Sequence, residues 1–182
     1  MMVENRSLLL EVEDLRTHFF LDEGTVHAVN GVSLQMHRGE TLGVVGESGC
    51  GKSVTARSIM RMVRPPGRIV SGRIMLHSWS GALGESIDLT ALDPKGPRMR
   101  SIRGLDMTMV FQEPISSLSP VHTVGNQMIE AIRLHRDVSK EEAYERAVEM
   151  LGNVELPEPS RGMRQYPHEL SGGMCQRVMI AM

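Results

Sequence analysis

The segment Gly46–Ser53 constrains the fold more than any other part of the chain. It reads GESGCGKS and fits the phosphate-binding loop pattern G-x-x-x-x-G-K-[ST]. The apolar run Glu40–Val45 before it suits a buried strand, and Val54–Val63 after it has helical spacing without Gly or Pro. Strand, loop and helix in this order are the context that the pattern needs. The sequence therefore predicts an α/β fold with a nucleoside triphosphate site, and an ordinary glycine-rich turn is the competing interpretation.

Each residue type in this loop has a physical reason to bind phosphate. Three glycines, at 46, 49 and 51, can take backbone angles closed to other residues, so successive N–H groups can curl around an anion. The following helix adds its N-terminal amides and its dipole. Lys52 can reach the β- and γ-phosphates, and the Ser53 hydroxyl is a ligand for Mg²⁺. The candidate nucleotide-binding residues in this part of the chain are Gly46, Glu47, Ser48, Gly49, Cys50, Gly51, Lys52, Ser53 and Val54.

Composition limits the classes of protein to consider. With 182 residues, 41% of them hydrophobic and 23% charged, the chain suits one folded domain, or one domain with a small insertion. The formal net charge is -2 and the basic residues are spread out, which gives no reason to expect a nucleic-acid partner. No run approaches the roughly 18 apolar residues that span a bilayer, so a membrane role would be peripheral. Cys50 and Cys175 form no disulfide framework, which favours a reduced, cytoplasmic chain.

Strand patterns dominate up to residue 112. The expected strands are Leu8–Leu15 at a sheet edge, Val26–Met36, Ile69–Leu76 around a Ser-Gly pair, and Met107–Phe111. Between His77 and Gly104 the pattern dissolves, and we expect a surface insertion with one short helix near Arg98–Ile102. Gln112 lies at the carboxyl end of the last of these strands, which is where ligands bind in an open α/β sheet.

Helical spacing replaces strand spacing beyond Pro114. One helix is expected over Val124–His135. Ser139 and Glu142 have the spacing of a capping box, which opens a second helix that stops at Gly152. The apolar positions that this second helix would bury are Ala143, Ala147, Val148 and Leu151.

A second helix start with bare amides is expected near the end of the chain. Ser171 is a candidate N-cap, and Gly172 and Gly173 leave the first-turn amides uncovered. Such a start suits a phosphate. A Ser-Gly-Gly turn alone is more often an ordinary helix start, and its pairing with a phosphate loop favours the functional interpretation.

Three motifs in this order make the chain resemble an ATP-binding-cassette (ABC) ATPase, and in particular the subunits that power oligopeptide, dipeptide and nickel importers. Gly46–Ser53 matches the Walker A loop, Phe111–Pro114 the Q-loop, and Tyr166–Gly173 the approach to the signature. The resemblance covers nearly all of the chain. The stretches most similar to the peptide-importer branch are Gly31–Leu34, Val45–Gly49 and Val178–Met182.

The resemblance implies a fold and a division into parts. The fold would be a P-loop NTPase core of the RecA-like type, with an antiparallel β subdomain and an inserted α-helical subdomain, C-terminally incomplete. Residues 1–112 would be the N-terminal part of the ATP-binding core, with the β subdomain and the P-loop. Residues 113–170 would be the helical subdomain, and residues 171–182 the signature and the start of the next helix.

The resemblance also implies roles for single residues. Phe19 resembles the aromatic residue that stacks on adenine, and Phe20 is the less suitable candidate. Gln112 would contact Mg²⁺ and the attacking water. Lys52 and Gln112 are therefore the catalytic candidates, and Ser53 and Gln112 the candidate metal ligands, for a site that holds ATP and Mg²⁺.

The signature residues would act on a neighbouring subunit. Ser171, Gly172 and Gly173 would bind the γ-phosphate of ATP held by the facing subunit. Cys175 stands where the branch usually has a basic residue, and we expect its side chain to face solvent rather than phosphate.

The implied function is that of an importer ATPase subunit, in which ATP binding and hydrolysis drive uptake of peptides or a related solute such as nickel or opines. The implied partners are a second ABC ATPase subunit, two membrane permease subunits and, indirectly, a solute-binding protein. The location would be peripheral, on the cytoplasmic face of the inner membrane. A soluble ABC protein of DNA repair or translation is disfavoured, because coiled-coil heptads, zinc cysteines and a basic surface are lacking.

One departure from the family pattern concerns hydrolysis. The Walker B Asp and the catalytic Glu, which follow the signature in the family, have no counterpart before Met182. We therefore expect a fragment or truncated product that hydrolyses little or no ATP alone. The alternative function is a non-catalytic nucleotide-binding or interaction fragment.

Overall fold

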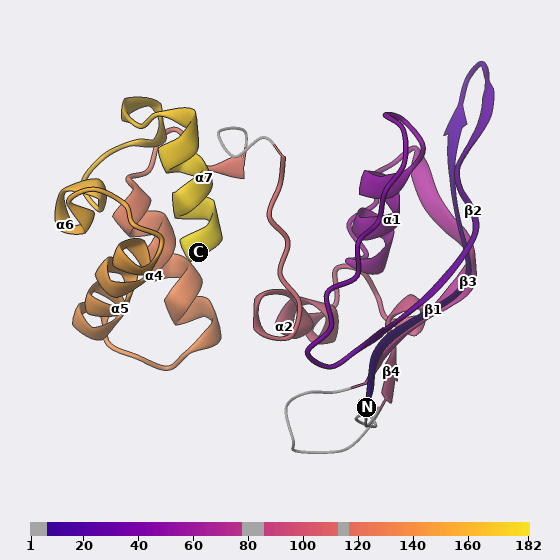
Figure 1. Ribbon diagram of the computed structural model, residues 1–182, viewed down its shortest axis with the longest axis horizontal. Helices are drawn as coiled ribbons and strands as arrows, with labels where there is room; N and C mark the ends of the chain where they lie inside the picture. The colour runs from indigo at the N-terminus through magenta and orange to yellow at the C-terminus, as the bar shows by residue number, and fades with distance from the viewer. Residues whose placement is uncertain (1–6, 78–85, 113–116) are drawn as a thin grey trace, which may run out of the picture. The chain divides into compact units, whose positions relative to one another are not determined.

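The computed structural model describes residues 7–77, 86–112 and 117–182. The chain divides into two compact units, Met1–Met107 and Thr108–Met182, the first built on a sheet and the second on helices (Figure 1). Glu113 and Pro114 of the expected Q-loop, and residues 78–85 of the expected insertion, lie outside the described residues. The predicted division at residues 112 and 170 stays a prediction.

The first unit contains a four-stranded antiparallel sheet with the strand order β2-β1-β3-β4. The strands are β1 (Leu8–Leu21), β2 (Gly24–His37), β3 (Gly67–His77) and β4 (Ser86–Asp88). β1 lies between β2 and β3, so the prediction of an edge strand at Leu8–Leu15 is wrong. Its alternation is weak because the pairing with both neighbours shifts register within residues 12–16, a bulge that carries Asp14 at φ 42.

Helices cover one face of this sheet. They are α1 (Lys52–Ile59), the 3₁₀ helix η1 (Leu89–Ala91) and α2 (Pro97–Leu105). α1 begins two residues before the predicted helix and ends early, because Arg61 adopts the left-handed region with φ 54. The expected surface insertion is not wholly on the surface, since it contributes three fully buried side chains to the core. The buried core of the unit consists of Leu10, Val12, Leu15, Val29, Ile74, Leu76, Leu89, Met99 and Ile102.

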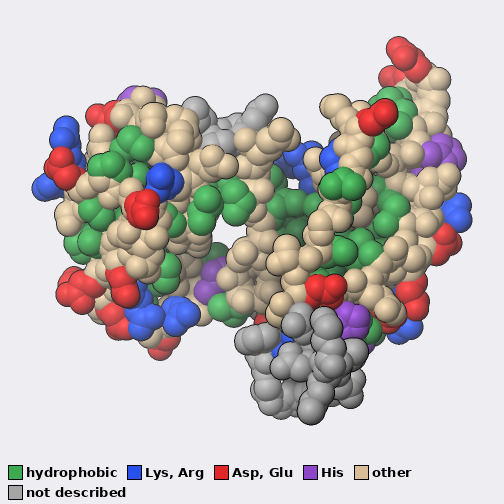
Figure 2. All heavy atoms as spheres, viewed as in Figure 1, with side chains coloured by type: hydrophobic (Ala, Val, Ile, Leu, Met, Phe, Trp, Pro, Cys, Tyr) green, Lys and Arg blue, Asp and Glu red, His purple; other side chains and the backbone are tan. Residues whose placement is uncertain are grey.

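Two expected strands are absent. Glu40–Val45 has no regular secondary structure, and Val45 at its end is 93% exposed. In Met107–Phe111 only Met107 forms an isolated bridge, with Arg103. An apolar run becomes a strand only when neighbouring strands take up its backbone hydrogen bonds, and the described strands pair only among themselves. Apolar side chains consequently reach the surface of this unit (Figure 2).

The second unit is helical, and its helices agree well with the sequence pattern. They are α4 (Val124–His135), α5 (Lys140–Asn153), α6 (Pro159–Gly162), the 3₁₀ helix η2 (Pro167–Glu169) and α7 (Gly172–Ala181). α5 packs against α4, α6 and α7. Its N-cap Ser139 accepts a hydrogen bond from the Glu142 N–H at 3.0 Å, whereas the Glu142 carboxylate pairs with Arg146. Ala143, Ala147 and Leu151 are buried as predicted.

No helix in the described parts of the chain is long and apolar enough to cross a membrane.

Candidate functional site

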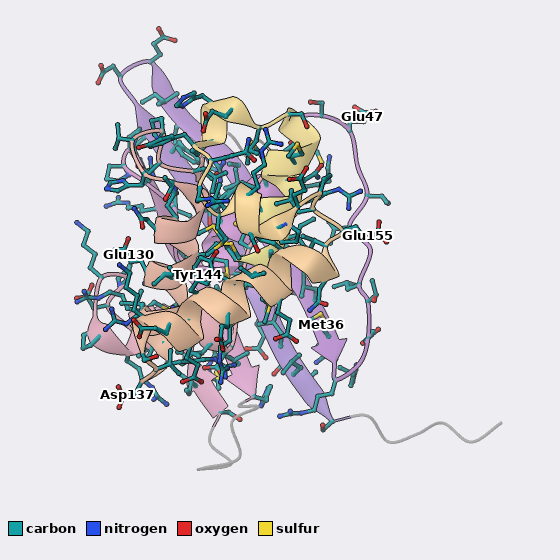
Figure 3. All side chains as sticks on the ribbon, turned by 90° about the vertical axis from the view of Figure 1, so that its left-hand side faces the viewer. Met36, Glu47, Glu130, Asp137, Tyr144 and Glu155 are labelled. Atoms are coloured by element: carbon teal, nitrogen blue, oxygen red, sulfur yellow. The ribbon has the colours of Figure 1, made fainter. Side chains whose placement is uncertain are left out.

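The loop Gly46–Ser53 is an exposed turn that leads into α1. The Cys50 N–H donates to the Glu47 carbonyl at 3.3 Å, and Gly49 and Gly51 have φ angles of 83° and 97°. The side chain of Glu47 points away from the chain into solvent (Figure 3). The loop therefore has the left-handed glycine geometry that the motif predicts, with its acidic side chain turned outward.

The Lys52 ammonium lies inside this loop. Its Nζ donates to the carbonyl oxygens of Gly46 and Glu47, at 2.6 Å each, and lies 3.5 Å from the Cys50 Sγ. A Cβ at position 46 would lie 2.7 Å from that sulfur, so the loop interior is tightly filled. An incoming anion has to draw Lys52 off these two carbonyls.

The start of α1 leaves backbone donors available. Gly51 is the N-cap and supplies no side-chain cap, and the first helical hydrogen bond is from the Thr55 N–H to the Gly51 carbonyl at 2.8 Å. The N–H groups of Lys52–Val54 consequently have no partner within the helix. Only glycine fits at position 51, because a Cβ there would lie 2.2 Å from the Ala28 carbonyl oxygen. Uncovered amides, a helix dipole and a cation meet at this point, which favours an anion.

The two adjacent phenylalanines point to opposite faces of the sheet. Phe19 shares its face with Thr17, which contacts α1, and its ring lies over Gly67, where a Cβ would be 2.6 Å away. Phe20 is on the other face, with the Arg68 guanidinium 4.3 Å from its ring centre. The geometry thus favours Phe19 over Phe20 for a ring stacked on the same side as the phosphate loop.

A buried pair of hydroxyl groups, which the sequence did not reveal, joins β1 to α1. Thr17 Oγ1 and Ser58 Oγ are 2.8 Å apart, and both residues are fully buried. The Ser58 hydroxyl donates to the Val54 carbonyl at 2.7 Å, so the Thr17 hydroxyl is the donor within the pair. The only signal in the sequence is that two polar residues occupy positions where the strand and helix patterns require apolar ones.

Two arginines hold the other end of α1. Arg103 donates to the carbonyls of Met60 and Arg61 at 2.8 and 2.7 Å, and Arg61 donates to those of Thr90 and Leu92 at 3.2 to 3.3 Å. Burial lowers the pKa of both guanidinium groups. Arg103 thereby satisfies carbonyl groups that the end of α1 leaves free, and Arg61 joins this end of α1 to the segment around η1.

The start of α7 in the second unit has a side-chain cap, and its first two residues are exposed. The Ser171 hydroxyl accepts from the Met174 N–H at 3.3 Å, which confirms the predicted N-cap. Gly172 and Gly173 are exposed, and a Cβ at either would meet nothing within 4 Å. The N–H groups of Gly172 and Gly173 have no partner within the helix, and neither glycine has a side chain that could cover them.

The prediction that Cys175 faces solvent is wrong. The side chain is fully buried beside Val178 in the core of the second unit, where its thiol contacts the Pro167 carbonyl at 3.4 Å. Burial raises the pKa of this thiol. Position 175 lies on the inward side of α7, and a small apolar residue suits it.

Gln112 is exposed in the second unit, and the residue before it is tied to α7. The Phe111 N–H donates to the Met179 Sδ at 3.2 Å. The structure thus places Phe19 and residues 46–54 in the first unit, and Gln112 and residues 171–173 in the second. Within the described residues no three His, Cys, Asp or Glu side chains gather as a metal site. The roles predicted for all these residues stay predictions.

Comparison with known proteins identifies the family. Residues 29–182 match the family model described as ABC transporter. The chain is 47% identical over 96% of its length to a probable peptide ABC transporter ATP-binding protein of Sinorhizobium fredii. It is 48% identical, again over 96% of its length, to the glutathione import ATP-binding protein GsiA of Escherichia coli. It spans 50% of the first protein and 27% of the second.

A solved structure supports the same assignment. The ATP-binding cassette MJ0796, in a dimeric post-hydrolysis state bound to ADP and Pi, superposes with a TM-score of 0.77 at 26% identity. The match covers 95% of this chain and 68% of that one. The fold class predicted from three ordered motifs is therefore confirmed. The chain belongs to the ABC transporter family, and the relatives that it matches are import ATP-binding proteins.

Proposed function

We propose that this chain is the ATP-binding part of an ABC importer ATPase, which couples ATP binding and hydrolysis to the uptake of peptides or a related solute. The observation that carries the proposal is the start of α1, where uncovered amides and the Lys52 ammonium converge in one exposed loop. The relatives named for peptide and glutathione import support the transport role.

The phosphates of ATP bind in the loop. The amides of Lys52–Val54 donate to phosphate oxygens, and Lys52 exchanges its two carbonyl partners for the β- and γ-phosphates. The Ser53 hydroxyl is exposed in the first turn of α1, beside these amides, and suits a Mg²⁺ ligand. Mg²⁺, when bound, neutralises charge on the phosphates. Gln112 is the proposed contact to Mg²⁺ and water from the second unit.

The base of the nucleotide lies at Phe19. This ring is only partly buried and shares a sheet face with the residue that contacts α1. The ring lies against Gly67, and the part of it that stays exposed is the proposed surface for stacking on adenine.

A facing cassette is one proposed partner, because the start of α7 is exposed. Exposed amides at Gly172 and Gly173, with no ligand group of their own nearby, suit the γ-phosphate on a facing cassette. The assembly that we propose contains a second ABC ATPase subunit and two permease subunits at the cytoplasmic face of the inner membrane, served by a solute-binding protein.

The alternative is a nucleotide-binding chain that does not turn over. It is favoured by the segment before the loop, where Leu42, Val44 and Val45 are exposed and no strand forms. A loop without a paired strand before it is held less firmly, which weakens the preorganisation that phosphoryl transfer needs.

Two measurements on the 182-residue chain test the proposal. In an ATP titration, Lys52→Ala should lose about 2 kcal/mol, or roughly 30-fold in affinity, because charged hydrogen bonds to phosphate disappear. Arg57→Ala, an exposed change on the same helix, should bind as the wild type does. Equal affinity in all three proteins would count against the loop as the site. Little phosphate release is expected from this chain under either candidate, so association with a membrane permease separates them. ATP-dependent association supports the importer ATPase, and ATP binding without association supports the alternative.

A further inference from the structure

One contact of the second unit joins two of the stretches that resemble the family, the start of the Q-loop match and Val178–Met182. The Phe111 N–H donates to the thioether of Met179 at 3.2 Å, across 68 positions of sequence. Phe111 lies in the stretch 108–112, which has no helix or strand, and Met179 lies on α7. A backbone amide that would find a carbonyl partner in a sheet thus finds a sulfur atom instead.

The helix that carries Met179 is held in one rotation by its core contacts. Val178, the residue before Met179, is fully buried in the core of the second unit, and so is Cys175 one turn earlier. These two side chains set the rotation of α7, and with it the direction in which the partly buried Met179 leaves the helix. The packing of the helix that begins at Ser171 therefore sets the side of α7 from which the Met179 side chain reaches Phe111.

The bond is weak and adaptable. A thioether is a weak acceptor on an unbranched side chain with three rotatable bonds. It can hold the Phe111 backbone in one place and still follow a small movement of it. Gln112 is the next residue and is exposed, so its place relative to α7 depends on this contact.

We infer that Met179 is a positioning residue for Gln112. Its sulfur anchors the Phe111 amide to the helix that carries the signature glycines, and thereby presents the Gln112 side chain. The anchoring is independent of ligand, whereas the purpose of presenting Gln112 rests on the proposed function, in which Gln112 contacts Mg²⁺ and water.

The anchoring can be tested by NMR, because the chain contains only three phenylalanines, Phe19, Phe20 and Phe111. Labelling with ¹⁵N-phenylalanine gives three backbone resonances, and Phe111→Leu identifies the relevant one. In Met179→Leu the Phe111 resonance should shift and its amide exchange should accelerate on the order of fivefold, as expected for one lost hydrogen bond. The resonances of Phe19 and Phe20 should stay in place.

Two further variants make this result specific. Met174→Leu, a partly buried change on the same helix against the same core, should leave Phe111 unchanged. Met179→Gln, which restores an acceptor on a side chain of similar length, should return the slow exchange. An unchanged Phe111 resonance in Met179→Leu, or an equal shift in Met174→Leu, overturns the anchoring.

The positioning role has its own readout, which is the gain in ATP affinity on adding Mg²⁺. Met179→Leu should reduce this gain about threefold, a fraction of one hydrogen bond, while the affinity without Mg²⁺ stays the same. Equal gains in both proteins overturn the positioning role. If the wild type binds no ATP at all, the proposed function fails, and the NMR result still decides whether Met179 anchors Phe111.

Discussion

The starts of α1 and α7 differ in the groups that surround their uncovered backbone N–H groups. Both helices begin at glycine-rich turns with uncovered amides. α1 has no side-chain cap, and a lysine ammonium lies in the loop before it. α7 is capped by Ser171 and has no acidic residue in its first turn.

Because of this difference, we expect the start of α1 to bind an anion by itself and the start of α7 to add contacts to an anion that another site holds. At α1 the amides are supplemented by a full positive charge, which an anion can recruit without help from another part of the molecule. At α7 one amide is already satisfied by Ser171, and two glycines leave open space in front of the rest. We therefore expect α1 to hold the triphosphate and α7 to add contacts to a phosphate held elsewhere.

The largest expected effect comes from a substitution at the glycine that begins α1. Gly51→Ala places a Cβ 2.2 Å from the Ala28 carbonyl oxygen at φ 97, and should destabilise the first unit by about 3 kcal/mol. Gly49→Ala is the matched control, since Gly49 also has positive φ but nothing lies within 4 Å of an added Cβ. It should cost only about 1 kcal/mol. Thermal unfolding measures both, and equal losses would contradict the close approach seen at position 51.

The next prediction concerns the alkylation of the two cysteines, one near the start of each helix. Cys50 is exposed and its sulfur lies beside Lys52, so an alkyl group there should fill the loop and block ATP binding. Cys175 is buried in the second unit and should not react in the folded protein. Mass spectrometry of the labelled chain gives both rates. Labelling of Cys50 that is equally fast with and without saturating ATP would mean that the thiol points away from the site.

A smaller effect is expected at the second start. Ser171→Ala removes the cap of α7 and should cost about 1 kcal/mol of stability in the second unit, whereas Ser171→Gly should cost a few tenths. Hydrogen exchange of α7 amides reports the loss locally. If the alanine variant keeps wild-type protection, the Ser171 hydroxyl does not stabilise the helix as the distance to Met174 indicates.

The smallest effect is a pH dependence confined to the first unit. His18 pairs with His27 across the hairpin with ring centres 4.0 Å apart, and its Nε2 is buried without a partner among the described residues. Burial, then the charges of His27 and Arg16, lower its pKa below the usual 6.5. The folded state therefore binds this proton less readily than the unfolded one. Its contribution is complete above pH 6.5 and is lost as the pH falls below that value.

Hydrogen exchange of β1 and β2 between pH 7.5 and 5.5 measures this loss. His18→Gln should flatten the dependence, because it removes the group that titrates. An equal pH dependence in the helices of the second unit would show that another group is responsible.

The comparison also shows which features the sequence can predict. The second unit was predictable because α4 and α5 carry their own signals, a 3.6-residue period and, for α5, the cap at Ser139. The phosphate loop was predictable because its glycine spacing has few other uses. The inward direction of Cys175 was not, since one residue on a short helix shows no period.

A strand forms only with a paired neighbour, and this limited the prediction of strands in the first unit. β1 and β2 pair through a short turn, so their pattern could be read locally. Residues 40–45 and 107–111 look like buried strands by composition, yet apolar composition alone does not supply the neighbours that a strand needs. The Thr17–Ser58 pair and the Phe111–Met179 contact join distant positions, and no local pattern encodes such contacts.

The buried hydroxyl pair of Thr17 and Ser58 has a consequence for selectivity. It joins β1, the strand that carries Phe19, to α1, the helix that follows the phosphate loop, through a hydrogen bond away from solvent. Their separation is set during folding, before any ligand arrives. Under the proposed function, in which Phe19 stacks on adenine and the loop binds the phosphates, this fixed separation disfavours a nucleotide whose phosphate chain is too short to reach the loop.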